Sequence, residues 1–172
     1  MDSEARRERI LELIRQQEAP LSASALAQTF GVSRQVIVGD VALLRAQGCE
    51  ILATARGYTI PRPAEASRYL GRVACQHAPE ETREELYAMV DAGAVVVDVT
   101  VAHELYGEIT GSLGLSRRSD VDAFVQKLAS SRNRLLSELT MGTHLHTIAC
   151  RDRAHFEQVR EVLDAKGYLY HD

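Results

Sequence analysis

Two histidines separated by one residue, His144 and His146, are well placed in this sequence to bind a metal ion. They stand in residues 143–148, where apolar or threonine side chains alternate with the histidines. Successive side chains of a strand point to opposite faces, so a strand here places both imidazoles on one face. From that rigid support both could reach one ion. The pair alone also fits one exposed histidine beside one structural histidine, so other residues must decide.

Further histidines lie where a sheet commonly builds a site. His77 and His103 each follow an expected strand, and the ends of strands are where α/β proteins place ligands. His155 stands among charged residues at the start of an expected helix, and His171 lies near the end of the chain. We interpret His155 and His171 as solvated side chains.

A carboxylate partner is expected in the glutamate-rich start of the helix that follows His77. The phase of the apolar residues in that helix turns Glu84 towards solvent and lets Glu85 face the site. Alternatively, all four glutamates only stabilise the helix N-terminus. That alternative explains Glu80 and Glu81 better than Glu85, which lies a turn further in.

Imidazoles and a carboxylate together favour one divalent transition metal per chain. Three imidazoles and one carboxylate suit Zn, Ni, Co or Fe(II), and do not suit Ca or Mg. Four such ligands complete a tetrahedral site, whereas an octahedral ion keeps two positions for water or a small anion. The sequence thus predicts a metal centre that is either closed or open to a ligand.

The elements that position these residues belong to the second of two domains. Residues 1–60 predict a winged helix-turn-helix, residues 61–70 with Pro61 and Pro63 a linker, and residues 71–172 an α/β sandwich with helices packed on one sheet. The chain is therefore expected to be an α+β protein of two domains. In the second domain strands are expected at 72–75, 94–101, 143–149 and 168–170, and helices at 79–92, 120–130 and 152–166.

The first domain predicts contact with DNA. Ser22 and Ser33 cap two short helices around a Gly31-Val32 turn, and the second of these helices would enter the major groove. Its first residues carry suitable donors and acceptors for base edges and phosphates, and a loop arginine stands at the expected wing tip. These candidate DNA contacts are Ser33, Arg34, Gln35 and Arg56. Alternatively, the winged helix serves as a protein-interaction module.

Composition limits the classes of partner. The chain has 172 residues and a net charge of −4, and its first 60 residues are neutral in total, so DNA binding must rest on a few placed arginines. No apolar run approaches the roughly 18–20 residues that span a bilayer, and the N-terminus lacks a signal-peptide core. The 3 cysteines are widely spaced, which suits small buried residues in a reducing cytoplasm.

In combination these motifs resemble a known family. The chain is similar to the NiaR-type niacin-responsive transcriptional repressors, which join a biotin-repressor-like winged helix to a three-histidine (3H) domain. The motifs that carry the resemblance lie in both halves of the chain: residues 33–38, Gly57-Tyr58, His77, residues 101–103, 106–108, Ser116-Arg117, Asp120-Val121 and residues 139–148. Two departures from the family pattern are Gly39 in the expected recognition helix and Ala102.

The resemblance implies a set of functional residues and partners. It assigns the metal ligands as His77, Glu85, His144 and His146. It also implies a homodimer that binds operator DNA, senses nicotinic acid and controls genes for NAD synthesis or niacin uptake. We expect nicotinate at or beside the metal, in a pocket formed by His103, Tyr106, Arg117 and Arg118.

Two other hypotheses remain open at this stage. A metal-dependent hydrolase with an accessory winged helix would need a metal-bound water and a base, for which His103 or Glu108 could serve. A structural metal that joins two protomers would instead have a closed set of four protein ligands.

Overall fold

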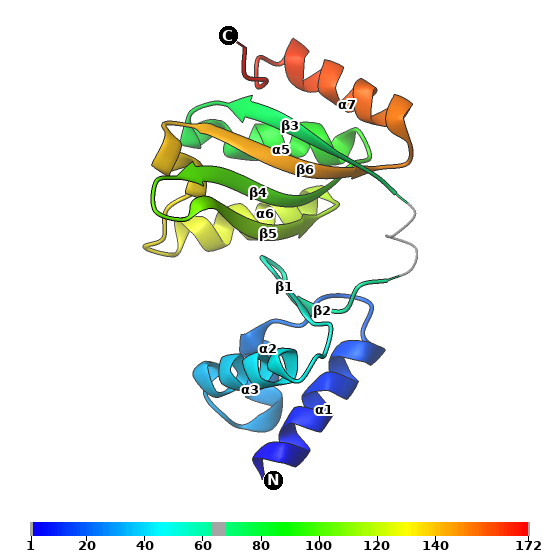
Figure 1. Ribbon diagram of the computed structural model, residues 1–172, viewed down its shortest axis with the longest axis vertical. Coiled ribbons are helices and arrows are strands. Elements are labelled where there is room, and N and C mark those ends of the chain that lie inside the picture. Colours follow the sequence, from blue (N-terminus) through cyan, green and yellow to red (C-terminus); the bar gives the residue numbers. More distant parts are fainter. Residues whose placement is uncertain (1, 63–67, 172) are drawn as a thin grey trace. The chain divides into compact units, whose positions relative to one another are not determined.

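The computed structural model describes residues 2–62 and 68–171 and divides into two compact units, Met1–Ala66 and Ser67–Asp172 (Figure 1). Residues 63–67 of the expected linker lie outside the described part. The combination of helices and sheet confirms the predicted α+β fold. Among the described residues, no helix has the length and apolar character needed to cross a membrane.

The C-terminal unit is a four-stranded antiparallel sheet with its helices on one face. The strand order is β3-β6-β4-β5, and Figure 1 shows α5 and α6 on the same side of the sheet. In chain order the elements are β3 (Tyr69–Gln76), the short helix η1 (Pro79–Glu81), α5 (Thr82–Asp91), β4 (Val95–His103), β5 (Gly107–Leu115), α6 (Arg118–Ala129), η2 (Leu136–Thr140), β6 (Thr143–Cys150) and α7 (Arg153–Ala165).

Buried apolar side chains fix this arrangement of layers. On α5, Leu86 and Met89 are 1% and 0% exposed, and α7 contributes Leu163 at 0%. The sheet contributes Val96 and Ile148, which are paired across β4 and β6 and are both 0% exposed. Burial of these side chains, at about 25 cal/mol per Å² of apolar surface, holds the helices on the sheet.

Two sequence expectations for this unit were wrong. Gly107–Leu115 forms the nine-residue strand β5, which was not expected because its glycines weaken the pattern of a strand. Residues 168–170 were expected to form a strand but contribute a single bridge, between Leu169 and Cys75. The bridge is flanked by backbone hydrogen bonds from Gln76 to Tyr168 and from Tyr170 to Ala74.

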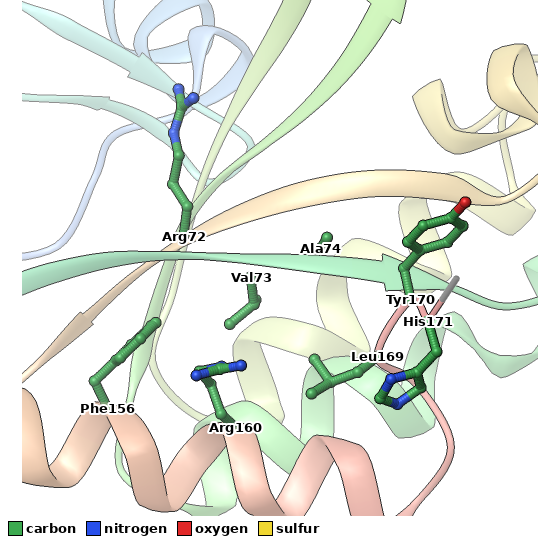
Figure 2. Close-up of a pocket in the computed structure, with 8 residues that line it drawn as sticks. All are labelled: Arg72, Val73, Ala74, Phe156, Arg160, Leu169, Tyr170 and His171. Carbon is green, nitrogen blue, oxygen red and sulfur yellow. The ribbon is translucent and has the colours of Figure 1, made fainter.

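A cavity of about 240 Å³ lies beside β3 and α7 (Figure 2). Arg72 points to one side of β3 in this view, and Val73 points to the other, towards α7. The guanidinium of Arg160 is bonded to Glu157 at 2.9 Å. This set is distinct from the expected metal ligands and pocket residues; the lining residues are Arg72, Val73, Ala74, Phe156, Arg160, Leu169, Tyr170 and His171.

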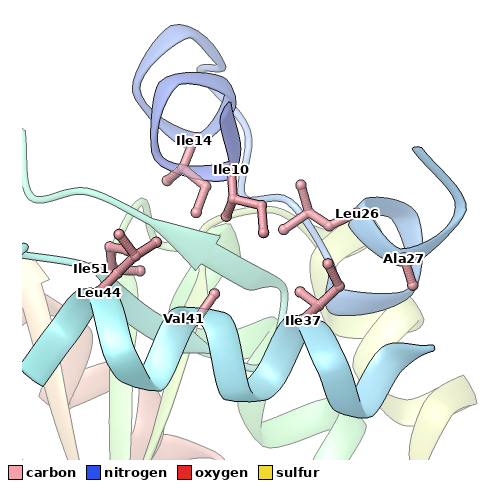
Figure 3. Close-up of a cluster of buried hydrophobic side chains, with 8 residues drawn as sticks. All are labelled: Ile10, Ile14, Leu26, Ala27, Ile37, Val41, Leu44 and Ile51. Carbon is pink, nitrogen blue, oxygen red and sulfur yellow. The ribbon is translucent and has the colours of Figure 1, made fainter. Parts of the chain in front are cut away.

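The N-terminal unit has the predicted order of three helices and a hairpin, namely α1 (Ser3–Gln16), α2 (Ala23–Phe30), α3 (Arg34–Ala46), β1 (Leu52–Thr54) and β2 (Gly57–Thr59). Side chains of Asp2, Ser22 and Ser33 cap the three helices. Figure 3 shows the apolar core between them, and its buried members are Ile10, Ile14, Leu26, Ala27, Ile37, Val41, Leu44 and Ile51.

A partly buried ion pair also joins α1 to α3. Asp40 is 4% exposed, and its carboxylate accepts from the guanidinium of Arg6 at 2.7 Å. Two apolar side chains of α3, those of Val36 and Leu43, face away from this core. They are 38% and 52% exposed, because Ile37, Val41 and Leu44 face the core instead.

Candidate metal centre

Strand β6 presents His144 and His146 on the buried face of the sheet, as its alternation predicts. The two residues are 4% and 3% exposed. Across the ladder to β3 they pair with Cys75 and Val73, whose side chains therefore share that face. The rings of the two histidines meet edge to face, with centroids 4.8 Å apart.

Glu85 on α5 lies at the centre of three imidazoles. It is 1% exposed, whereas its neighbour Glu84 is exposed, as the helical phase predicts. Its Oε2 lies 2.7 Å from Nε2 of His77, and its Oε1 lies 2.9 Å and 3.3 Å from Nε2 of His144 and His146. The structure thus brings together the four residues that the family resemblance named.

The opposite ring nitrogen of each histidine is held by a backbone carbonyl. Nδ1 of His77 donates to Ala78 at 2.8 Å, and Nδ1 of His144 donates to Gly142 at 2.8 Å. A neutral imidazole has one donor and one acceptor nitrogen, so these bonds leave a lone pair on Nε2, directed at Glu85. Rings fixed in this tautomer are ready to bind a cation.

An irregularity in β4 provides the backbone carbonyl that bonds Nδ1 of His146. The ladder shifts register between Val96 and Asp98, and the carbonyl of Asp98 accepts from Nδ1 of His146 at 2.7 Å. The Asp98 carboxylate also accepts from the backbone N–H of Thr147 at 3.1 Å. A bulge of this kind re-aims groups beside a site.

Two of the converging nitrogens lack a properly directed partner. Among the described residues, Nε2 of His77 and Nε2 of His146 are buried without a hydrogen bond, although a Glu85 oxygen lies within 3.3 Å of each. Buried lone pairs facing a carboxylate are unfavourable unless a cation lies between them. The donor set therefore fits a divalent transition metal.

Titration of the cluster agrees with a site for a cation. Burial alone would raise the pKa of Glu85, but the charge of His146 and close contacts with all three imidazoles lower it well below its usual range. Burial alone would lower the pKa values of His77 and His146, but interaction with Glu85 raises both.

Cys75 is a member of this cluster that sequence reasoning interpreted only as a small buried residue. Its Sγ, a carboxylate oxygen of Glu85 and a ring nitrogen of His144 all lie within 4.8 Å of one another. The signal that could have found it was its position at the end of the expected strand 72–75, two residues before His77, since residues two apart in an extended segment share a face.

Close packing around Gly142 positions the start of β6. Gly142 has φ +93°, and a Cβ there would lie 2.4 Å from the carbonyl oxygen of His77. Only glycine allows this approach of the two backbones. The residue before it, Met141, has φ 51° and is 92% exposed.

His103, one of the expected pocket residues, has a different hydrogen-bonding pattern from the three clustered histidines. Nδ1 of His103 accepts from the backbone N–H groups of Leu105 and Tyr106, at 3.2 Å and 3.4 Å. In the neutral ring the proton is therefore on Nε2, the reverse of the three clustered histidines. Tyr106 is 70% exposed and stacks on His103 with ring centroids 5.2 Å apart.

The two arginines expected in the pocket lie at the start of α6. Arg118 donates to both carboxylate oxygens of Asp91, at 2.8 Å and 2.6 Å, and covers the ring of Tyr87. This pairing raises the pKa of Arg118. Arg117 is exposed at the N-cap of α6. Arg118 thus has a carboxylate partner of its own chain.

The interpretation of His155 as a solvated residue was wrong. It is 6% exposed, its Nε2 donates to the carbonyl of Ala92 at 2.6 Å, and its Nδ1 accepts from the backbone N–H of Arg151 at 3.2 Å. It ties α7 to the end of α5. His171 is exposed, and its Nε2 lies 2.8 Å from a carboxylate oxygen of Asp164.

The expected DNA contacts lie at the start of α3 and in the β1–β2 turn. Arg34 and Gln35 are exposed, and Arg56 is half-buried. The hydroxyl oxygen of Ser33 accepts from the backbone N–H of Val36 at 3.3 Å, so it caps α3.

Comparison with known proteins supports both halves of the chain. Residues 6–59 match an HTH domain and residues 71–172 match the 3H domain. The chain is 38% identical over 169 residues to the transcription repressor NadR of Bacillus subtilis, covering 97% of this chain and 94% of that protein. It is 40% identical over 160 residues to the probable transcription repressor NiaR of Thermotoga maritima, covering 93% and 90%.

These matches confirm the resemblance and give no support to the hydrolase hypothesis. Both relatives are repressors by name, and the matched HTH domain is that of a DNA-binding protein. The chain belongs to the NadR/NiaR family of transcription repressors, with an HTH domain followed by a 3H domain.

Proposed function

We propose that this protein is a cytoplasmic, dimeric repressor that senses nicotinic acid through a divalent transition metal and controls genes for NAD synthesis or niacin uptake. The observation that best supports a metal-based sensor is the convergence of three histidine Nε2 atoms on the buried carboxylate of Glu85. Such a cluster costs stability without a cation, so a binding role explains its presence.

His77, Glu85, His144 and His146 would hold the ion. When bound, an octahedral ion supplies open positions that accept a carboxylate or a pyridine nitrogen. The chain's own contribution is to fix the three tautomers through backbone carbonyls and to exclude water from the cluster.

His103 is suited to bind the effector rather than the ion. It lies on β4 four residues beyond Val99, and Val99 pairs with His146. Because side chains alternate along a strand, His103 and Val99 lie on the same face of the sheet as the metal ligand His146. Its Nε2–H is a donor, as recognition of a carboxylate or ring nitrogen requires. Tyr106 stacked on it offers a flat apolar face to an aromatic ring.

The N-terminal unit would read the operator. Arg34 can contact guanine and Gln35 adenine in the major groove, while Ser33 and Arg56 contact phosphates or the minor groove. A dimer would bind two half-sites about one helical turn apart. Effector binding and operator binding must then change each other's affinity by the same factor.

The test combines calorimetry with operator binding. Nicotinate should release heat with metal-loaded protein and none with chelator-stripped protein, and nicotinamide, which lacks the carboxylate, should bind more weakly. In parallel, operator affinity measured by fluorescence anisotropy should change on addition of nicotinate.

Two control variants separate the parts of the proposal. Arg34→Ala should weaken operator binding by about 1–3 kcal/mol and leave nicotinate binding intact. Glu84→Gln should change neither. If nicotinate binds metal-free protein equally well, or leaves operator affinity unchanged, the proposed sensor is wrong.

A further inference from the structure

We propose that Cys75 is a further ligand of the metal, so that the centre contains a thiolate beside the carboxylate and the imidazoles. This inference rests on the proposed metal site and adds to it a soft, anionic donor. It would make the centre a mixed sulfur, nitrogen and oxygen site.

The first support is position. Cys75 is 0% exposed and stands directly opposite His144 in the ladder between β3 and β6. Its Sγ lies within 4.8 Å of both a Glu85 oxygen and a His144 nitrogen. Two ligands with bonds of about 2.0–2.3 Å to one ion are separated by at most about 4.6 Å. Side-chain movement that closes these separations would bring Sγ to bonding distance of an ion held by Glu85 and His144.

A second support comes from atoms that lack partners. Nε2 of His77 and Nε2 of His146 belong to side chains that are 3% and 4% exposed, and among the described residues neither has a directed hydrogen bond. Both nitrogens are aimed at the carboxylate of Glu85, which Cys75 also adjoins. The unsatisfied nitrogens and the sulfur thus border one small buried volume.

Charge balance gives a third reason. A divalent ion held by one carboxylate and three neutral imidazoles leaves one uncompensated positive charge in a buried site. An isolated buried charge is costly. Binding of Cys75 replaces its S–H bond by a sulfur–metal bond, and the proton leaves to solvent. The ion, Glu85 and the thiolate then sum to zero charge.

The other cysteines serve as matched controls. Cys150 is 1% exposed on β6 but pairs with Tyr69, towards the other end of the sheet from His144. Cys49 is half-buried in the N-terminal unit. Since the chain has 3 cysteines, the double variant Cys49→Ser/Cys150→Ser retains Cys75 alone.

Cobalt(II) binding tests the inference on the full chain. The wild type, the double variant and Cys75→Ser are stripped with chelator, loaded with Co(II) under reducing conditions, and measured by metal analysis and absorption spectroscopy. The visible bands report Co(II) bound to protein, and a near-ultraviolet charge-transfer band reports a sulfur–cobalt bond.

We expect the near-ultraviolet band in the wild type and in the double variant. Cys75→Ser should bind Co(II) about 10- to 100-fold more weakly and without that band. Bound Co(II) without the band in the double variant overturns the inference, and so does a band that persists in Cys75→Ser. Absence of any Co(II) binding by the wild type would instead overturn the proposed metal site itself. The double variant leaves Cys75 intact, so it decides even if Cys75→Ser fails to fold.

Discussion

Replacing Glu85 with glutamine is the sharpest perturbation of the proposed metal centre. Glutamine has nearly the shape of glutamate but lacks its charge, and its amide can donate a hydrogen bond to an Nε2 lone pair. We therefore expect Glu85→Gln to fold without metal, and to lose its response to metal. The reason is that the Glu85 carboxylate is the negatively charged metal ligand that lies close to the Nε2 atoms of all three histidines.

The expected rise in Tm on metal binding can be estimated, because a ligand that binds only the folded state stabilises it. Metal at 100 times its Kd stabilises a folded protein by about 2.7 kcal/mol. One kcal/mol shifts the Tm of a small domain by roughly 4–8 °C, so the wild type should gain about 10–20 °C. A 100-fold weaker site gains about 0.4 kcal/mol at the same metal concentration, or roughly 2–3 °C.

The assay is thermal unfolding followed by circular dichroism, with and without Ni(II) or Zn(II). Glu84→Gln is the matched control, because Glu84 is the exposed neighbour on α5 and should keep the full metal response. An equal metal-induced rise in Tm in Glu85→Gln and the wild type would refute the placement of the ion at Glu85.

Three further predictions follow from local geometry. The pKa values of His77 and His146 are raised in the folded state, so protonation of these residues stabilises the metal-free protein at low pH, and this stability is lost as pH rises through the raised values. Metal affinity, measured by titration at a series of pH values, should rise over the same range because protons then compete less with the metal. A metal affinity that does not change with pH would contradict this prediction. Gly142→Ala should destabilise the protein more than Gly107→Ala in urea unfolding, since both glycines have positive φ but only a Cβ at 142 meets backbone at 2.4 Å. Gly39→Ala should stabilise the protein by about 0.5–1 kcal/mol in the same assay, because Gly39 is helical with open space at its Cβ; an unchanged or lower midpoint would count against this.

Much of the site could be predicted because local periodicity controls it. The alternation around His144 and His146 fixed one face of a strand, and helical phase separated Glu85 from Glu84. Both are short-range patterns that the fold preserves. The choice of His77 over His103 as a ligand came from family resemblance, because both residues follow strands. In the structure, the 2.7 Å between Nε2 of His77 and Oε2 of Glu85 and the different backbone partners of the two Nδ1 atoms distinguish them.

Other features depend on contacts that a single sequence does not reveal. Cys75 joins the cluster through its register with His144, which is set by pairing of distant strands. His155 has charged neighbours in the sequence, as a solvated residue would, yet its ring is buried and donates a hydrogen bond to the carbonyl of Ala92. In α3, Val36 and Leu43 are apolar but face outward, because the helix rotates to bury Ile37 and Leu44.

The measurement that tests the central claim most directly is a crystal structure of metal-loaded protein soaked with nicotinate, with anomalous data collected at the absorption edge of the metal. The account predicts one anomalous peak per chain within about 2.0–2.3 Å of the Nε2 atoms of His77, His144 and His146 and of a Glu85 oxygen, with a nicotinate donor beside it. An anomalous peak elsewhere, or nicotinate bound away from this cluster, would contradict it.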